Sequence, residues 1–287
     1  MKKRIIGFVT LLFCLAASLN LHAQTPEEQT VPETTDEAIA LFQAMTDTMS
    51  NETKEVIYEM IEKTIISAVD SIIEQGMYIQ ALQAIDTIQI NWKKLTQMEP
   101  TLRMYMRKIQ IFGAMEEWAK LVETSEECLK THSSTMTDEA CAHIYNWNGL
   151  GNSNLQKYKE ALFSYEKTLA YYTKSGNVGN QANAICRIAY CYSKIEKKST
   201  ALSLYEKGFN KYLQYFNVTK DYLLNHTLSF TDPKKKLCLS DFSLNLFNMA
   251  LFAQEIDDYA ARKDYLKMSA NCGWEPAKKE YDRIYSY

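Results

Sequence analysis

The stretch KYKEALFSYEKTLAYY, residues 157–172, has a counterpart forty residues later, KKSTALSLYEKGFNKY, residues 197–212. Both stretches hold alanine, leucine, tyrosine, glutamate and lysine in the same frame. Apolar residues recur every three or four positions between polar ones, which is typical of a helix with one buried face. A half-buried helix that is written twice at a fixed interval predicts a chain built from stacked copies of one helical unit.

The forty-residue step extends in both directions from Ala161. Four positions on one face of the expected helix then form columns: Ala81, Leu121, Ala161 and Ala201; Tyr78, Trp118, Tyr158 and Lys198; Ile85, Ser125, Tyr165 and Tyr205; Ile88, Cys128, Thr168 and Gly208. A small side chain in the first column lets two helix backbones approach closely. We therefore expect Ala161 and Ala201 to be buried where the two helices of a unit cross.

A second helix precedes each of these, with buried positions at i, i+4 and i+7. Its faces are Ile65, Val69 and Ile72; Tyr105, Ile109 and Phe112; Tyr145, Gly149 and Asn152; Ile185, Ala189 and Tyr192. In the third copy Asn152 stands where the other copies have apolar residues. Turn-forming residues separate the helices, at Gly76, Gly113, 137–139, Gly176, Gly179 and 199–200.

The pattern resembles the tetratricopeptide repeat (TPR) family. The fourth copy carries the family's spacing in Ile185, Ala189, Tyr192, Ala201 and Tyr205. The third copy carries it in Tyr145, Gly149, Ala161 and Tyr165. The period of forty is longer than the family's, which is about 34. The resemblance implies an all-α fold, a right-handed α-solenoid of antiparallel helix pairs, over residues 36–287. Its units would lie near 61–100, 101–140, 141–180 and 181–217.

The frame changes after Phe209. A further pair would have Leu244, Phe247 and Leu251 on its first helix and Ala261, Tyr265 and Met268 on its second. Because sixty residues separate Ala201 from Ala261, we place an insertion at 218–236 and a terminal pair with a capping helix at 237–287. The stretch 265–284 resembles the end of a Sel1-type repeat, a relative of the TPR, and Pro276 would start the capping helix.

The first 23 residues have the organisation of a signal peptide. Lys2, Lys3 and Arg4 precede the apolar run Ile5–Ala17, and cleavage is expected before Gln24. The alternatives are an uncleaved anchor and lipidation at Cys14. Residues 24–35 are acidic and contain prolines, which predicts a disordered linker. A helix capped near Thr35 would follow, with Ile39, Phe42, Met45 and Met49 on one face. This organisation predicts export, to a bacterial periplasm, to the outer membrane or into the medium.

Charge argues against nucleic acid as a partner. Removing the signal segment takes away three basic residues and no acidic one, so the net charge falls from −3 to −6. An acidic chain is poorly suited to phosphate backbones. The run DPKKK at 232–236 is interpreted as a solvated loop. No further membrane-spanning segment is expected after the signal peptide.

Six cysteines remain after the signal segment: Cys128, Cys141, Cys186, Cys191, Cys238 and Cys272. They are interpreted as small buried residues. An exported chain also permits disulfides. Two pairings would fit the expected helices, Cys128 with Cys141 and Cys238 with Cys272.

The sequence contains none of the phosphate-loop, dinucleotide, metalloprotease or hydrolase-elbow motifs. His132, His143 and His226 are interpreted as surface or cap residues, and the adjacent glutamate pairs as solvated faces. We therefore expect no catalysis, no cofactor and no metal.

The TPR resemblance implies that first helices line a concave groove. Carried over position by position, it selects Arg103, Asn146, Asn183 and Tyr190 among others, and Arg107, Arg187 and Lys194 flank these positions. These seven are the candidate ligand-binding residues. The arginines would share a channel suited to a carboxylate-bearing segment. Changing them would alter stability by no more than about 0.5 kcal/mol. The alternative is that they are ordinary solvated helix-face residues.

The leading hypothesis is an exported, non-catalytic scaffold that binds a protein or peptide through this groove. A second hypothesis is an architectural subunit of an envelope complex without a peptide groove. A third is an unrecognised hydrolase or a glycan-binding protein. The sequence does not identify the partner.

Overall fold

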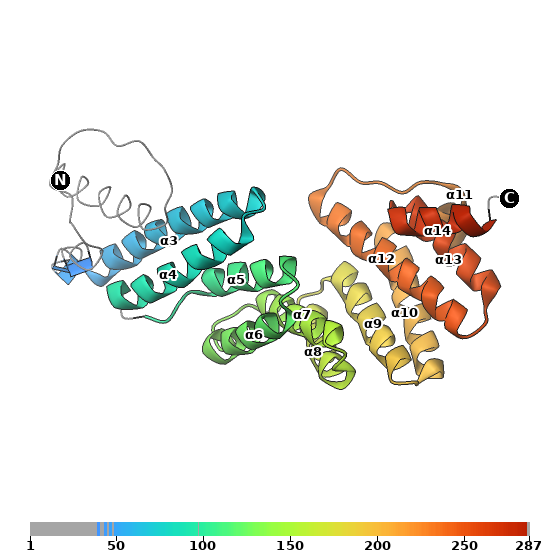
Figure 1. Cartoon of the computed structure of the whole chain (residues 1–287), viewed down its shortest axis with the longest axis horizontal. Helices are drawn as coiled ribbons and strands as arrows, with labels where there is room; N and C mark the ends of the chain where they lie inside the picture. The colour runs from blue at the N-terminus through green and yellow to red at the C-terminus, as the bar shows by residue number, and fades with distance from the viewer. Residues whose placement is uncertain (1–38, 41–42, 45, 48, 97, 286–287) are drawn as a thin grey trace. The chain divides into compact units, whose positions relative to one another are not determined.

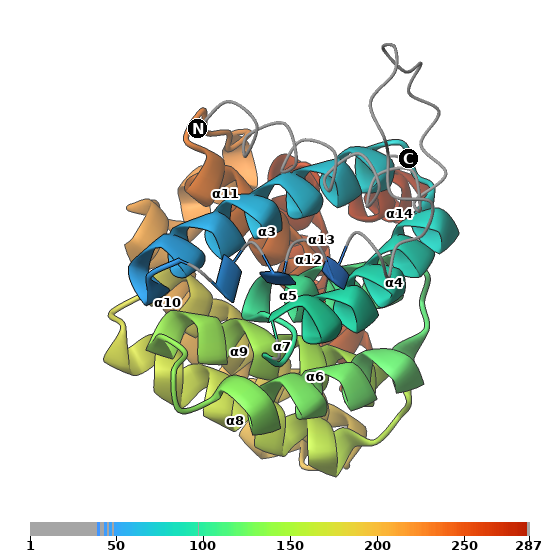
Figure 2. The same cartoon turned by 90° about the vertical axis from the view of Figure 1, so that its left-hand side faces the viewer.

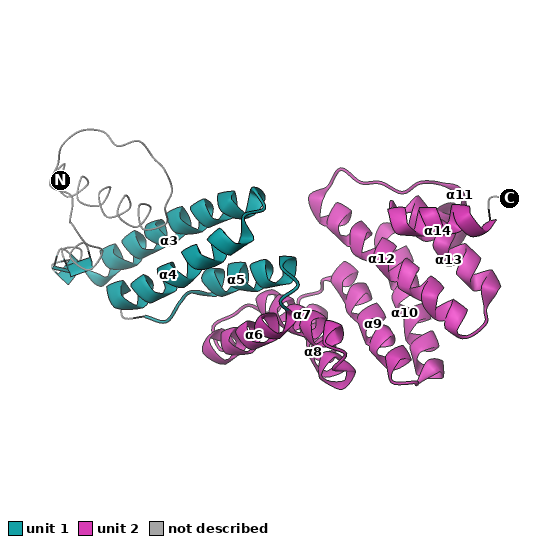
Figure 3. Cartoon of the chain, viewed as in Figure 1, with its two compact units in different colours: residues 1–117 teal, residues 118–287 magenta. Residues whose placement is uncertain are grey.

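A computed structural model describes residues 39–40, 43–44, 46–47, 49–96 and 98–285 (Figure 1). The described residues form twelve α-helices and no strand, so the predicted all-α class is confirmed. The expected signal peptide 1–23, the linker 24–35, Phe42 and Met45 lie outside these residues. The residues divide into two compact units, one up to Glu117 and one from Trp118 onwards (Figure 3).

Unit 1 contains three helices: α3(Asn51–Glu74), α4(Tyr78–Thr96) and α5(Leu102–Ala114). Unit 2 contains nine: α6(Trp118–His132), α7(Asp138–Asn154), α8(Tyr158–Lys174), α9(Val178–Lys194), α10(Lys198–Phe216), α11(Lys220–Asn225), α12(Pro233–Glu255), α13(Tyr259–Asn271) and α14(Glu275–Tyr285). Helices α7 and α9 begin three residues before the starts expected for the third and fourth repeats.

In unit 1, α3 and α4 lie side by side in both views (Figures 1 and 2). Ser50 caps α3 by accepting a hydrogen bond from the Thr53 backbone. The helices bury one apolar stripe each, including Ile61 and Ile65 on α3 and Ile88 and Trp92 on α4. Helix α5 packs against both, as the i, i+4 pattern predicts.

In unit 2, each helix from α6 to α9 packs on the next one, and α9 and α10 also pack on α12. Ala161 and Ala201 are fully buried, which confirms the expected close approach of paired helices. Tyr165 and Tyr205, four residues further on, are among the largest fully buried side chains. The small-then-aromatic columns in the sequence therefore mark the helix contacts.

One backbone turn recurs between the two helices of each pair. Its central residue is left-handed, with φ between 58° and 73° at Gly76, Glu116, Gln156, Glu196 and Asp257. The first four positions are forty residues apart. In the third pair the Lys157 amide donates to the Asn152 carbonyl, which closes the C-terminal end of α7 in the manner of a Schellman motif. The forty-residue period predicted from the side chains is therefore also the interval at which the left-handed turn residue recurs.

The faces predicted for the last pair are displaced, by two residues at Leu244 and Leu251 on the first helix and by one residue at Ala261 on the second, although Met268 is fully buried. Leu251 is 42% exposed, and the buried positions of α12 include Leu246, Ala250 and Ala253. The turn residues Glu196 and Asp257 show that the step is 61 rather than 60. Arg262, not Ala261, therefore occupies the column of Ala201, and its guanidinium pairs with Glu280.

The insertion expected at 218–236 folds back onto α13. Leu223 of α11 is fully buried. The Leu228 amide donates to the Asn271 carbonyl at 3.0 Å, and the Asn271 side chain donates to the Leu223 carbonyl at 2.8 Å. The expected capping helix is present as α14, with Ala277 buried. The segment is therefore held to the last helix pair.

The cysteine pairings expected from the sequence are not formed. All six thiols are free and buried. The Cys238 sulfur lies toward α9, where a Cβ added to Gly179 would meet it at 2.8 Å. Burial raises the pKa of Cys128 to about 12, and that of Cys238 equally far. Such thiols stay protonated and unreactive at neutral pH.

Candidate functional site

The candidate ligand-binding residues fall on two separate units. Arg103 and Arg107 belong to α5 of unit 1. The Arg107 guanidinium makes a two-pronged contact with Asp70 of α3, and its Nη2 lies 2.9 Å from Asp70 Oδ2. Arg103 lies 3.6 Å from Glu62. Both arginines therefore connect successive first helices, and Arg107 has its carboxylate partner inside the fold.

Asn183 and Arg187 also have their hydrogen-bond and ion-pair partners within the fold, here in unit 2. Arg187 Nε donates to Asn183 Oδ1 at 3.2 Å, Nη1 to the Tyr165 hydroxyl at 3.4 Å, and Nη2 lies 3.8 Å from Asp241 Oδ1. The side chain of Arg187 is only 18% exposed. The Asn245 side chain completes the cluster by donating to Asn183 Oδ1 at 3.0 Å. The cluster joins α9 to α8 and α12.

Burial alone would lower the pKa of Arg187, but Tyr165 and Asp241 oppose this effect and the pKa is raised overall. Burial raises the pKa of Asp241, and Arg187 acts against that rise. The guanidinium is thus charged and has internal partners. A groove-facing role that needs a free guanidinium does not match these contacts.

Tyr190, Lys194 and Asn146 are more accessible. Tyr190 is half-buried, with Tyr158 edge-on at 6.3 Å and Lys194 Nζ 5.4 Å from its ring centre. Lys194 also forms an ion pair of 2.8 Å with Glu255 of α12. Asn146 is half-buried on α7. Tyr190 and Lys194 therefore place one aromatic and one cationic side chain side by side at the C-terminal end of α9.

A different face of α7 lines an opening in unit 2. An open groove of about 710 Å³ runs over α7 between α6 and α8. That volume is in the range of binding pockets, about 300–1,000 Å³. Each helix contributes one face to the lining: Val122, Glu126 and Leu129 from α6; Tyr145, Asn148 and Asn152 from α7; Lys159, Glu160, Phe163 and Ser164 from α8, with Lys157 just before it. We call this site the α6–α8 groove.

The floor of the α6–α8 groove is a buried hydrogen-bond network. Asn148 Nδ2 donates to Ser125 Oγ at 2.9 Å, and Asn148 Oδ1 accepts from Ser164 Oγ at 2.7 Å. Asn152 Nδ2 donates to the same oxygen at 3.0 Å and to the Asn148 carbonyl at 3.1 Å. Among the described residues nothing donates to Asn152 Oδ1, although Asn152 is only 4% exposed. The floor therefore presents one uncommitted acceptor.

The walls of the groove differ from its floor. Val122, Leu129 and Tyr145 are half-buried, and Phe163 is 56% exposed. Tyr145 stacks on Tyr171 at 5.8 Å, which fixes its ring. Two lysines and two glutamates lie along the lining, so it carries no net charge. The two walls can contact apolar groups of a ligand, and the floor can accept a hydrogen bond from a ligand donor.

The next repeat explains why this space is open. Forty residues on, Asn148, Asn152 and Ser164 correspond to Ile188, Tyr192 and Leu204. Those three belong to a packed apolar cluster with Tyr165, which itself corresponds to Ser125. Smaller polar side chains in the third repeat leave the equivalent space unfilled. The sequence contains one sign of this, Asn152 in an apolar column, but it does not predict the groove itself.

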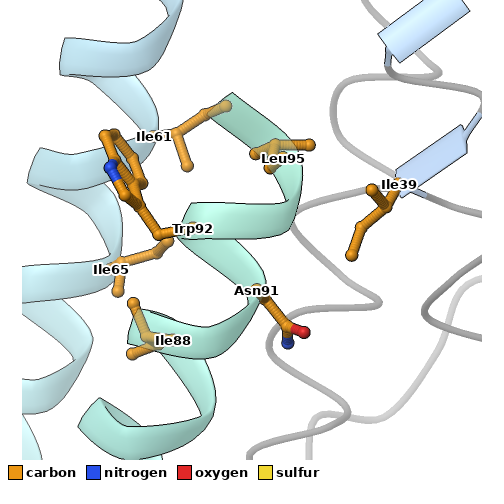
Figure 4. A pocket seen from close by; sticks show the side chains of 7 residues that line it. All are labelled: Ile39, Ile61, Ile65, Ile88, Asn91, Trp92 and Leu95. Carbon is orange, nitrogen blue, oxygen red and sulfur yellow. The ribbon is translucent and has the colours of Figure 1, made fainter. Parts of the chain in front are cut away.

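Two other features are not candidate ligand sites. The cavity in unit 1 has a volume of about 10 Å³ and is lined by Asn91, by Ile39 and by five apolar residues of α3 and α4 (Figure 4). It is too small for more than about one water molecule. Within the described part of the chain, no group of three or more His, Cys, Asp or Glu residues could hold a metal ion.

None of the described helices is long and apolar enough to cross a membrane.

Several solved structures have a fold similar to that of this chain. The chain is similar to BtubC from P. vanneervenii, with 14% identity, a TM-score of 0.56, and coverage of 88% of this chain and 90% of that one. It is similar to a P. anserina putative kinesin light chain with nearly identical TPR-like repeats, at 14% identity, a TM-score of 0.52, and coverage of 76% and 96%. It is also similar to the quorum sensor NprR from B. thuringiensis, at 13% identity, a TM-score of 0.53, and coverage of 99% and 73%.

No protein-family model matches the sequence, and no curated protein matches it. The structural likeness, together with the helix pairs, defines the class: an α-solenoid with TPR-like repeats.

Proposed function

We propose that this chain is a non-catalytic scaffold that binds a protein or peptide partner, and that the α6–α8 groove is its binding site. One observation carries the proposal. A repeat position that holds a packed apolar cluster in α8–α10 holds an open groove of about 710 Å³ in α6–α8. The arginines selected from the sequence support it indirectly, because their charges are already paired within the fold.

Photo-crosslinking tests the location. A benzoylphenylalanine replaces Phe163 at the groove in one variant and Leu202 on α10 in another. Both positions carry exposed apolar side chains, 56% and 41% exposed, on second helices of neighbouring pairs. The proposal predicts a partner adduct, in the cells that make the protein, at position 163 and not at 202. Equal adducts at both positions, or none at 163, would contradict it.

The face of α9 is the second candidate surface. Tyr190 and Lys194 of α9 are partly accessible, and Leu251 of α12 is 42% exposed. Asn146 of α7 is half-buried. A crosslinker at Tyr190 that captured the partner, with none captured at Phe163, would favour this face. In this second arrangement Asn183, Arg187 and the unit 1 residues Arg103 and Arg107 would position the helices rather than touch the ligand.

We further propose export to the cell envelope, on the basis of Lys2, Lys3, Arg4 and the apolar run Ile5–Ala17. Mass spectrometry of the native protein should find a mature N-terminus near Gln24. An intact Met1 on protein from the cytoplasmic fraction would contradict export.

A further inference from the structure

We infer that the α6–α8 groove recognises its partner through an arginine side chain, whose guanidinium donates to one acceptor from each helix: Glu126 of α6, Asn152 of α7 and Glu160 of α8. This inference rests on the proposed function and names the chemical group that the same site would recognise. It depends on the charge and shape of one side chain, and not on the backbone conformation of the partner.

The floor of the groove presents an acceptor and needs a donor from the ligand. Its hydroxyl hydrogens are already used, because Ser125 Oγ donates to the Val122 carbonyl at 2.7 Å and Ser164 Oγ donates to Asn148 Oδ1 at 2.7 Å. Asn152 Nδ2 is used as well, in its two bonds to Asn148. No described residue donates to Asn152 Oδ1, although this side chain is only 4% exposed and lines the groove. A ligand that covers this oxygen without donating to it would leave a buried acceptor unpaired.

Two carboxylates lie on the opposite walls of the groove. Glu126 and Glu160 are both exposed, and no described residue forms an ion pair or a side-chain hydrogen bond with either carboxylate. Asp70 and Asp241 differ from them, because each has an arginine of the chain beside it. Charge complementarity therefore favours a cationic ligand group between the two walls.

A guanidinium fits this set of acceptors better than an ammonium group does. It is planar, carries five N–H donors and accepts no hydrogen bond. It can therefore donate to the Asn152 amide oxygen and to carboxylates on both walls, whereas a lysine donates from a single nitrogen. A guanidinium is also more weakly hydrated than an ammonium, so entry into a partly enclosed site removes less favourable hydration.

The apolar parts of the walls suit the rest of an arginine side chain. Phe163 lies three residues after Glu160 on α8 and is 56% exposed. Guanidinium groups stack on aromatic faces, and the Phe163 ring already accommodates one cation, because Lys167 Nζ lies 5.4 Å from its centre. Val122 and Leu129 on α6 can contact the aliphatic stem of the arginine.

Two lysines set the direction from which the arginine enters. Lys157 and Lys159 line the groove at the turn between α7 and α8, and both side chains are exposed. They repel a cation, so the arginine would enter from the side of Phe163. They also favour an acidic group of the partner at the turn. The expected recognition element is therefore an arginine beside an acidic residue, and not a strongly basic segment.

The test selects phage-displayed random peptides on the whole mature chain. Counter-selection uses the variant Asn148→Ile/Asn152→Tyr/Ser164→Leu, which copies the next repeat and fills the groove. Enriched peptides are then synthesised with arginine, with lysine, and with citrulline, which has the shape of arginine but no charge.

The protein variants remove one acceptor at a time and do not rely on the folding of the groove-filled variant. Glu126→Gln and Glu160→Gln remove the charges of the walls, and Asn152→Leu removes the acceptor of the floor. Glu123→Gln and Glu166→Gln are the matched controls, because these exposed glutamates lie on the same two helices outside the groove lining. Thermal unfolding checks that each variant is folded.

We expect the enriched peptides to share an arginine. Its replacement by citrulline should lower the affinity about tenfold or more, because hydrogen bonds to charged groups are stronger than those between neutral groups. Glu126→Gln, Glu160→Gln and Asn152→Leu should each lower the affinity to a similar degree, and the matched controls should bind as the wild type does. A charge exchange gives a readout that a merely structural role would not: peptides with glutamate in place of the arginine should bind Glu160→Arg more tightly than they bind the wild type.

The outcomes separate this inference from the proposed function. The inference is overturned, and the proposed function stands, if groove-dependent peptides share no arginine, bind equally well with citrulline or lysine in its place, or depend on Lys157 and Lys159 through an acidic residue alone. If no peptide is enriched whose binding depends on the groove, both are overturned.

Discussion

At the residue scale, the same strained backbone conformation recurs at one turn residue in each helix pair. Where each first helix ends, the chain adopts a left-handed conformation that favours glycine, yet only the first pair has glycine there. Gln156 has φ 60° at the end of α7. A residue with a Cβ in this region costs about 1–2 kcal/mol relative to right-handed backbone.

We predict that Gln156→Gly stabilises the protein by about 0.5–1 kcal/mol, because relief of strain is offset in part by the greater freedom of glycine in the unfolded chain. Urea unfolding measures the change. Gln156→Ala is the control and should give no comparable gain, since alanine keeps the Cβ. Equal midpoints for the glycine and alanine variants would contradict the account of this turn.

For Arg187, its position in the repeat leads to a wrong expectation about its environment. The family spacing places it on an exposed face and predicts little effect on stability, but the structure surrounds it with Asn183, Tyr165 and Asp241. The reason is that Asp241, on a helix beyond the insertion, packs against α9. No local pattern in the sequence relates these two positions.

We predict that Arg187→Met destabilises the protein by up to roughly 3–5 kcal/mol, because Asp241 is left without its partner in a largely buried site. Lys194→Met on the same helix breaks the more exposed pair with Glu255 and should cost no more than about 1 kcal/mol. Thermal unfolding of both variants tests this. The two variants behaving alike would show that the Arg187 cluster is not structural.

At the scale of elements, the contact between α7 and α8 includes a half-buried histidine, His143. The Tyr172 hydroxyl lies 3.1 Å from His143 Nδ1. Burial lowers the pKa of His143, and the nearby Glu139 carboxylate acts against this shift. Nδ1 of a neutral imidazole can accept a hydrogen bond from the Tyr172 hydroxyl, whereas the protonated ring has no acceptor atom.

A lowered pKa in the folded state means that the unfolded chain binds more protons, so stability rises with pH through this window. The contribution of His143 is complete above the unfolded pKa of about 6.5 and is lost as pH falls toward the lower folded pKa. We predict that wild type loses more stability than His143→Gln between pH 7.5 and 5. Urea midpoints over this range measure it, with His226→Gln, at an exposed position, as the control. Parallel curves for wild type and His143→Gln would disprove the linkage.

The helical elements are largely predictable from the sequence, because a buried face repeats its small and aromatic residues wherever the same contact recurs. Ala161 and Tyr165 recur as Ala201 and Tyr205, and the interval between the two copies defines the period. The prediction for the last pair is wrong because Ala261 resembles the column of Ala201, while the insertion moves the step to 61.

The groove escapes prediction because asparagine and serine in a helix usually indicate a solvent-facing position. Here their burial depends on partners from three helices, Asn148 with Ser125 and Ser164. Such a network is defined by packing between helices, which no single helix pattern contains.

At the scale of the whole molecule, we propose that the smaller polar side chains of the third repeat open the binding site. Unit 2 contains both the filled and the open version of the same position, so the comparison is made within one chain. The ion pairs of α5 and α9 and the attachment of α11 to α13 then hold the helices of each unit in place.

The most direct test is hydrogen exchange of the full mature chain, with and without a saturating amount of the partner captured at position 163. The account predicts slower amide exchange in fragments covering 118–174, which form α6, α7 and α8. Protection confined to α9 and α12, to the α11–α14 region or to residues 51–117, or no change in 118–174, would contradict the claim that the α6–α8 groove is the binding site.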